Sequence, residues 1–170
     1  KREMLTLQGI QQYYVALDND YHKYLTVKDL YSQLNIGQSI IYCNSVSRTE
    51  KLYNSMLTED FPVNKIHSKM SQTERNKIYD DFKTGEIRVL ISTDLFSRGI
   101  DIQQVSIVIN YDLPKSVHTY LHRIGRSGRW GRKGLGINLI TRKDIHILKE
   151  IEGYYNTQIS ELPSDYMNCI

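Results

Sequence analysis

Short apolar runs and segments of helical period alternate along the chain. The apolar runs cover residues 11–17, 39–44, 63–67, 87–93, 106–112 and 136–141. Between them lie segments whose apolar residues recur every three or four positions, at 20–34, 47–59, 71–85, 116–124 and 143–156. Apolar runs this short are typical of β-strands, and a period near 3.6 is typical of amphipathic helices. The pattern predicts strand and helix in turn through most of the chain.

Residues that begin helices stand at the start of three helical segments. Ser47 with Glu50, and Ser71 with Glu74, have the spacing of a capping box, in which each side chain forms a hydrogen bond with the backbone of the first turn. Ser116 stands where the N-cap of the fourth segment is expected. These positions fix where we expect the helices to begin.

The order of the elements indicates the fold class. Residues 87–93 and 106–112 are continuously apolar and rich in β-branched side chains, as in strands buried on both faces. Gly85 just before them is the expected end of a helix. Strand followed by helix, repeated at this spacing, implies right-handed βαβ units. We therefore expect an α/β fold of three layers, α-β-α, with a mostly parallel sheet.

Length and composition favour one domain. The chain has 170 residues, of which 40% are hydrophobic, and this is enough for one compact core. We expect residues 1–8 to be a linker, residues 9–163 to form the domain, and residues 164–170 to be a C-terminal tail. Because the first residue is Lys, we also expect the chain to be part of a longer protein.

The positive charge is concentrated in one segment. The chain has 22 basic and 19 acidic residues, and five of the basic residues lie within 122–133. The remainder therefore carries 17 basic against 19 acidic residues. A charge gathered in this way indicates a discrete anion site more than a protein coated for nucleic acid.

Several classes of protein are disfavoured. The two cysteines have no metal-ligand spacing, so neither zinc nor a disulfide framework is expected, and a reducing compartment fits. We expect no metal ligands in the chain itself. No signal peptide or apolar span of about 18–20 residues is present, so we expect an intracellular protein of the cytoplasm or nucleus, without a membrane partner.

Polar segments follow several of the predicted strands. In open parallel sheets, ligands gather beyond the carboxyl ends of the strands. Gln72 and Arg75 fall in the first turn of a predicted helix, where unpaired N–H groups and an arginine suit a phosphate. The alternative is a capped surface helix with a solvated arginine.

Residues 92–101 offer a second candidate site. They combine hydroxyl groups, carboxylates, an arginine and a glycine: Ser92, Thr93, Asp94, Arg98, Gly99 and Asp101. Hydroxyl groups and backbone amides at the end of a strand can hold phosphates, and a carboxylate can accept hydrogen bonds from a ribose. The alternative is a turn with an internal Arg–Asp pair.

The segment HRIGRSGR, residues 122–129, is the third candidate site and the least favourable as a continued helix. Three arginines would lie close together if the preceding helix continued, and like charges so placed repel. Two glycines lower its helix propensity further. Both features favour a site that a polyanion enters, while a disordered Arg/Gly tract that binds RNA loosely is the alternative.

No complete nucleotide site is present. The chain has no GxxxxGK[ST] phosphate loop and no acidic pair at a strand end to hold Mg²⁺. It could supply charge to a nucleotide site, but it lacks the parts to hold and activate a nucleotide alone.

Four motifs together resemble one family. SIIYCNS (39–45), SQTER (71–75), STDLFSRGID (92–101) and HRIGRSGR are similar to motif IV, the Gln-x-x-Arg motif, motif V and motif VI of DEAD-box RNA helicases. The order matches the second, C-terminal RecA-like domain, and the resemblance runs to about Pro163. Within the family the chain is most similar to initiation factor 4A and its exon-junction and ribosome-biogenesis relatives.

The resemblance implies roles in ATP hydrolysis. Arg126 and Arg129 are expected to be arginine fingers that reach the γ-phosphate of ATP held by another domain. His122 and Arg123 would bridge to that domain and its water network.

The resemblance also implies binding residues. Asp101 would accept hydrogen bonds from the ATP ribose, with Gly99 beside the nucleotide and Arg98 facing the partner domain. The residues expected to hold RNA phosphates are Ser45, Gln72, Arg75 and Thr93. Such contacts are independent of sequence.

The implied whole is an ATP-dependent RNA helicase. Its cofactor would be ATP with Mg²⁺, whose ligands are expected in an N-terminal RecA-like domain outside this chain. The implied partners are RNA, that domain, and a HEAT-repeat scaffold of the initiation-factor type. The fragment alone is expected to be monomeric and without ATPase activity. The competing hypothesis is a non-enzymatic RNA-binding or scaffold module with the same fold.

Overall fold

The computed structural model describes residues 7–34, 36–95, 105–127 and 134–166. Seven strands form one sheet: β1 (Ile10–Ala16), β2 (Ser39–Tyr42), β3 (Val63–Ile66), β4 (Val89–Ser92), β5 (Ile107–Asn110), β6 (Gly134–Ile140) and β7 (Ser160–Glu161). They lie in the order β3-β4-β2-β5-β6-β1-β7. All pairs between these strands are parallel. The predicted parallel sheet is confirmed.

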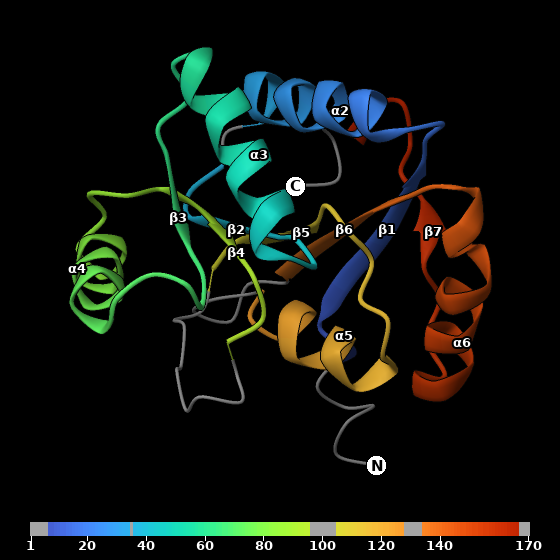
Figure 1. Ribbon diagram of the computed structural model, residues 1–170. Helices are drawn as coiled ribbons and strands as arrows, with labels where there is room; N and C mark the ends of the chain where they lie inside the picture. Colours follow the sequence, from blue (N-terminus) through green and yellow to red (C-terminus); the bar gives the residue numbers. More distant parts are fainter. Residues whose placement is uncertain (1–6, 35, 96–104, 128–133, 167–170) are drawn as a thin grey trace.

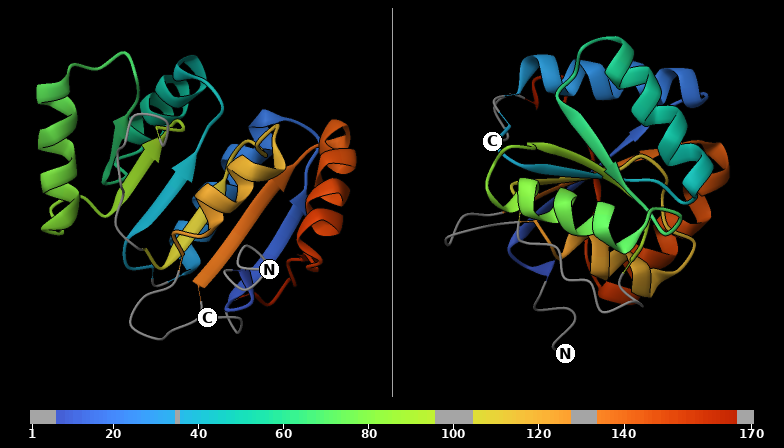
Figure 2. Two further views of the ribbon diagram at one scale, coloured as in Figure 1. Left: turned by 90° about the horizontal axis from the view of Figure 1, so that it is seen from below. Right: turned by 60° about the vertical axis from the view of Figure 1, so that its left-hand side comes forward.

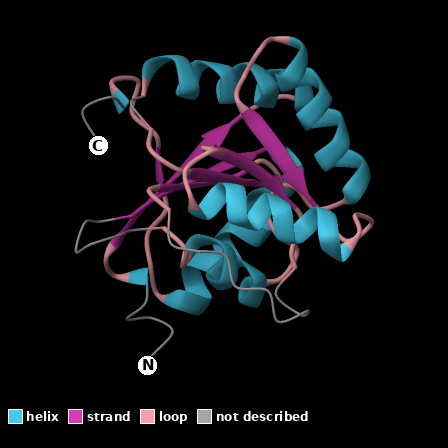
Figure 3. Ribbon diagram, turned by 90° about the vertical axis from the view of Figure 1, so that its left-hand side faces the viewer, coloured by secondary structure: helices cyan, strands magenta, loops and turns pink. Residues whose placement is uncertain are grey.

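Helices cover both faces of the sheet (Figures 1, 2 and 3). The helices are α2 (Asp20–Gln33), α3 (Val46–Thr58), α4 (Gln72–Lys83), α5 (Val117–Ile124) and α6 (Ile145–Tyr155), with a short 3-10 helix, η2 (Arg142–Asp144), before α6. One core cluster joins α2 and α3 to the sheet, and another joins α4, α5 and α6 to it. Side chains of β2 alternate between the two, since Ile40 packs in one cluster and Ile41 in the other. The three-layer prediction is therefore also confirmed.

Three predicted helix boundaries are confirmed in atomic detail. Ser71 and Glu74 form a capping box at the start of α4, with both reciprocal hydrogen bonds present. Gly85 follows the end of α4 with a φ of +86°, a conformation that glycine adopts without strain. Ser116 is the N-cap of α5, as predicted.

The predicted start of α3 is wrong. Ser45, two residues before the predicted cap, accepts a hydrogen bond from the backbone N–H of Arg48 and begins the helix. Glu50, the expected partner of Ser47, instead binds Lys65 and His67 on the neighbouring β3 and its loop. A contact across the fold therefore takes the side chain that the local pattern assigned to a cap.

The sequence pattern also missed β7. This two-residue strand pairs with the middle of β1, and Leu162 donates its backbone N–H to the carbonyl of Tyr14 at 2.9 Å. Tyr166 further along donates to Asp29 of α2 at 2.7 Å. The described part of the predicted tail thus packs on the domain.

None of the helices in the described parts of the chain is both long and apolar enough to cross a membrane.

The contact of β6 with α5 gives a test of this packing. A Cβ added at Gly136 would lie 2.8 Å from Cδ1 of Ile124, which is fully buried. We predict that Gly136→Ala lowers the free energy of unfolding by about 1–3 kcal/mol through overpacking. Gly153→Ala is the matched control, because nothing lies within 4 Å of its added Cβ. In helix α6 that change should raise stability by about 0.5–1 kcal/mol. Urea denaturation checks both, and equal effects would contradict the packing.

Candidate functional site

The candidate site lies at the carboxyl edge of the sheet. Neighbouring strands β2 and β5 are followed by α3 and α5, which pack in different core clusters and so lie on opposite faces. Where the loops after two neighbouring strands lead to opposite faces of the sheet, a crevice forms between them. Ligands of open α/β sheets bind at this position, the topological switch point. Segments 43–45, 93–95 and 111–116 all meet this edge.

Arg123, near the end of α5, connects these segments. Its side chain is fully buried. Nε and Nη2 donate to the two carboxylate oxygens of Asp94 at 2.8 and 2.7 Å. Nη1 donates to Oδ1 of Asn110 at 3.1 Å and to the carbonyl of Asp112 at 2.7 Å, and Nη2 also donates to Oδ1 of Asn44 at 2.6 Å. A guanidinium has five N–H donors, and these contacts engage all its nitrogens.

The contact of Arg123 with a second domain, which the resemblance implies, stays a prediction, and within this domain the side chain points inward. The face of α5 that carries Arg123 also carries Tyr120 and Ile124, and all three are fully buried in this domain. The guanidinium also lies over the ring of Tyr42, 5.2 Å from its centroid. Arg123 therefore organises the interior of the site and does not project from it.

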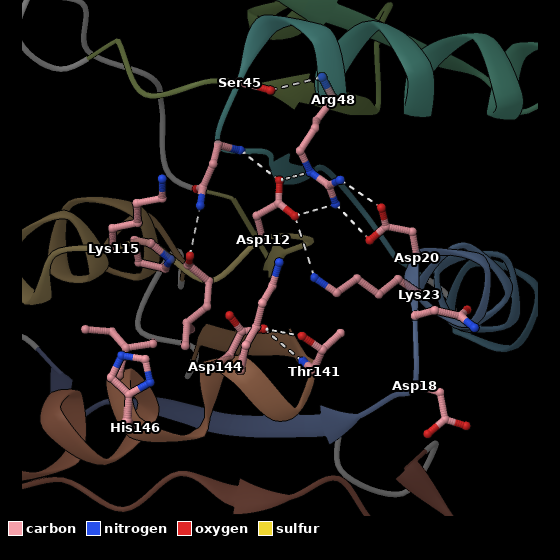
Figure 4. A pocket seen from close by; sticks show the side chains of 16 residues that line it. Asp18, Asp20, Lys23, Ser45, Arg48, Asp112, Lys115, Thr141, Asp144 and His146 are labelled. Carbon is pink, nitrogen blue, oxygen red and sulfur yellow. Dashed lines mark hydrogen bonds and ion pairs between the residues drawn. The ribbon is translucent and has the colours of Figure 1, made fainter.

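A second ionic cluster borders the same edge (Figure 4). Asp112 accepts from Arg48 Nε at 2.7 Å and from the backbone N–H of Asn44 at 2.9 Å. Lys23, also buried, lies 3.6 Å from Asp112. Burial raises the pKa of Asp112, but the hydrogen bonds from Arg48 and Asn44 outweigh it and hold the pKa below its ordinary value.

The cluster lines a crevice of about 980 Å³. Arg48 also forms two hydrogen bonds with Asp20, so each of its charged contacts is made within the protein. Ser45 stands on the same wall of the crevice. The cations deep in this crevice are compensated, which makes them structural supports of the edge.

Arg75 and Thr93 differ from these compensated groups. Arg75 is only 8% exposed, and its Nη2 donates to Oε1 of Gln72 at 3.0 Å. Its Nε and Nη1, and the equally buried Oγ1 of Thr93, have no hydrogen-bond partner among the described residues. Buried donors without partners are rare because each costs free energy. An anion bound here would accept hydrogen bonds from these groups of Arg75 and Thr93.

The other expected site residues are divided between the described and undescribed parts of the chain. Ser45 and Gln72 are exposed, and Ser45 is the N-cap of α3. His122 is exposed and Arg126 is half-buried, both at the end of α5. Arg98, Gly99, Asp101 and Arg129 lie outside the described residues. The described residues include no group of three or more His, Cys, Asp or Glu that could hold a metal ion.

Sequence reasoning missed the partners of Arg123. Asn44 lies 79 residues from Arg123 in the chain, Asn110 and Asp112 lie 13 and 11 residues from it, and no motif pairs them with it. The available signal was that Asn44 and Asp112 end the predicted strands 39–44 and 106–112, and that Asn110 is a polar residue within the second of them.

Comparisons with known proteins identify the family and support the fold. The helicase conserved C-terminal domain family matches residues 22–131. An ATP-dependent RNA helicase FAL1 of Coccidioides immitis is 51% identical over the whole of this chain, which covers 43% of that protein. The C-terminal domain of the DEAD-box protein Dbp5 is 36% identical, with a TM-score of 0.85 over 94% of this chain and 93% of that one.

Dbp5 of S. cerevisiae bound to RNA and ADP BeF3 is also similar, with 36% identity and a TM-score of 0.82 over 90% of this chain and 41% of that one. The chain belongs to the helicase conserved C-terminal domain family, and it is the RecA-like C-terminal domain of the DEAD-box type. It spans about 43% of the length of the FAL1 relative.

The ion pair between the buried Arg123 and the exposed Asp94 generates a stability prediction. Asp94→Ala leaves a fully buried guanidinium without its carboxylate, so we expect the free energy of unfolding to fall by about 3 kcal/mol. Asp81→Ala is the matched control, because Asp81 pairs with Lys77 across one turn of α4 where Lys77 is 76% exposed. That change should cost less than about 0.5 kcal/mol. Similar losses for both variants in chemical denaturation would contradict the role of Arg123.

Proposed function

We propose that this chain is half of the catalytic unit of an ATP-dependent RNA helicase. It supplies an RNA phosphate-binding surface and arginine fingers, and an N-terminal RecA-like domain supplies the site that holds ATP and Mg²⁺. ATP and RNA together close the two domains, and hydrolysis reopens them. The membership in the helicase C-terminal family and the names of the relatives support this proposal.

The observation that carries the RNA site is the uncompensated buried donors of Arg75 and Thr93. Arg75 lies in the first turn of α4, where free backbone N–H groups and the helix dipole favour a negative charge. Thr93 lies beside the end of β3, since its backbone N–H donates to the carbonyl of Ile66. Gln72 holds one nitrogen of Arg75 and thereby orients the guanidinium. With Ser45 further along the edge, these groups form a track for RNA phosphates that needs no contact to a base.

The fingers extend from the end of α5. Arg126 follows Arg123 by three residues, so the buried hydrogen bonds of Arg123 hold the base of the segment that carries it. We assign Arg126 and Arg129 to the γ-phosphate of ATP, and His122 to the contact with the partner domain. Because a finger stabilises charge that develops in the transition state, it acts only when the domains meet.

The remaining assignments complete the nucleotide half-site. Asp101 accepts from the ribose, Gly99 lies beside the nucleotide, and Arg98 faces the partner domain. We assign residues 9–163 to the domain and 164–170 to a short tail, and Leu7, within the segment 1–8 expected to be a linker, is buried in the core.

The finer identity is an initiation factor 4A-type helicase that acts in translation, at the exon junction or in ribosome biogenesis. Relatives named FAL1, which are 51% and 52% identical to this chain, support the assignment to this group of helicases. We propose an intracellular role in cytoplasm or nucleus, and a HEAT-repeat scaffold as partner.

The finger assignment predicts a specific loss of activity. In the two-domain protein, Arg126→Ala and Arg129→Ala should each lower RNA-stimulated ATP turnover by about 10³–10⁵-fold, while ATP binding stays nearly unchanged. Arg142→Ala removes an exposed arginine of η2 and is the control. Near-normal turnover in the finger variants, or the same loss in the control, would refute the assignment. Absence of ATP turnover in the unsubstituted two-domain protein, with RNA present, would favour the non-enzymatic RNA-binding module.

The proposed RNA track predicts a loss of RNA affinity that does not depend on the RNA sequence. Arg75→Ala should weaken binding of single-stranded RNA equally for oligomers of different sequence, because the contact is to phosphate. Lys77→Ala, on the exposed side of the same helix, should bind as the wild type does. Fluorescence anisotropy with two unrelated RNA sequences checks this. A loss confined to one sequence would contradict a phosphate contact.

A further inference from the structure

The loop between β3 and α4 is a fixed turn beside the proposed RNA track. Met70 donates its backbone N–H to the carbonyl of His67 at 3.2 Å, which closes a turn over residues 67–70. Within it, the backbone N–H of Lys69 donates to Nδ1 of His67 at 3.2 Å. Two hydrogen bonds to His67, one from Lys69 and one from Met70, thus fix the backbone conformation at Lys69.

His67 anchors this turn to the body of the domain. Its side chain is buried, with only 4% of the residue exposed, and its Nε2 lies 2.6 Å from a carboxylate oxygen of Glu50 on α3. Because Nδ1 accepts from Lys69, the proton sits on Nε2 and is donated to Glu50. The turn therefore keeps one geometry before any ligand arrives.

Lys69 is exposed at this turn and belongs to none of the ion pairs formed by described residues. The two nearby carboxylates are already engaged. Glu50 binds Lys65 and His67, and Glu74 accepts from the backbone N–H of Ser71 in the capping box. Hydrogen bonds from Ser71 also hold the pKa of Glu74 below its ordinary value.

The turn lies next to the uncompensated donors. Ile66 at the end of β3 pairs with Ser92, and Thr93 donates its backbone N–H to the carbonyl of Ile66 at 3.4 Å. Three residues after Lys69, α4 begins and brings Arg75 to the same edge. The turn that carries the exposed Lys69 thus adjoins the strand end of Thr93 and leads into the helix of Arg75. Both of these side chains have buried polar atoms without a partner among the described residues.

We propose that Lys69 is a further phosphate-binding residue, which extends the contacts of Arg75 and Thr93 to an adjacent phosphate of single-stranded RNA. The proposal rests on the proposed RNA-binding function. Since the turn is preorganised, the contact costs little ordering of the backbone.

The dependence of binding on salt tests the proposal. The two-domain protein, with a non-hydrolysable ATP analogue, is titrated with labelled oligouridine and with an RNA of mixed sequence between about 50 and 200 mM salt. For single strands, the slope of log K against log salt becomes shallower by about 0.7 for each phosphate that the protein no longer neutralises. The affinity deficit of Lys69→Ala at low salt should therefore shrink by roughly 2.5-fold over this range, for both RNAs alike.

Two matched variants complete the experiment. Lys69→Arg keeps the charge and should restore the wild-type slope. Lys149→Ala removes an exposed lysine of α6 that forms no described ion pair, and its slope should equal that of the wild type.

The outcomes separate this proposal from the one on which it rests. If Lys69→Ala has the slope of Lys149→Ala while Arg75→Ala makes the slope shallower, Lys69 is not a phosphate ligand and the RNA track stands without it. If Arg75→Ala also leaves affinity and slope unchanged, the RNA track itself is wrong, and the role of Lys69 falls with it.

Discussion

A fully buried guanidinium must satisfy its donors inside the protein, and Arg123 does so with groups from separate segments of the chain. Asn44 follows β2, Asp94 follows β4, and Asn110 and Asp112 end and follow β5. The hydrogen bonds of Arg123 connect the loops that follow these strands at the carboxyl edge. One side chain on α5 therefore sets how the loops of three strands and the end of a helix lie relative to one another.

The charged groups of this edge divide into two kinds. Arg123, Arg48 and Lys23 are paired with carboxylates or carbonyls of the same domain. Arg75 is buried almost as deeply, yet two of its nitrogens have no partner among the described residues. The compensated charges fix the geometry of the edge, and the uncompensated Arg75 is the one to which we assign the proposed RNA contact. The two assignments rest on hydrogen bonding and not on residue type.

What the sequence could predict depended on how far each interaction reaches. The capping box of Ser71 and Glu74 and the stop at Gly85 are decided within a few residues, and both were predicted correctly. The parallel sheet followed from the alternation of strand and helix. The cap at Ser45 was missed because Glu50 is drawn to Lys65 and His67, which are distant in sequence. The inward position of Arg123 was missed for the same reason, since its partners come from three other segments.

Amide hydrogen exchange of the domain tests the central role of Arg123 most directly. Lysine retains the positive charge but cannot reproduce the forked hydrogen bonds of arginine. In the Arg123→Lys variant, amides of residues 43–46 and 93–95 should exchange faster together, while those of β6 and β1, which Arg123 does not contact, keep their protection. Unchanged exchange in both loops, or acceleration confined to α5, would contradict the account that one buried arginine holds the site together.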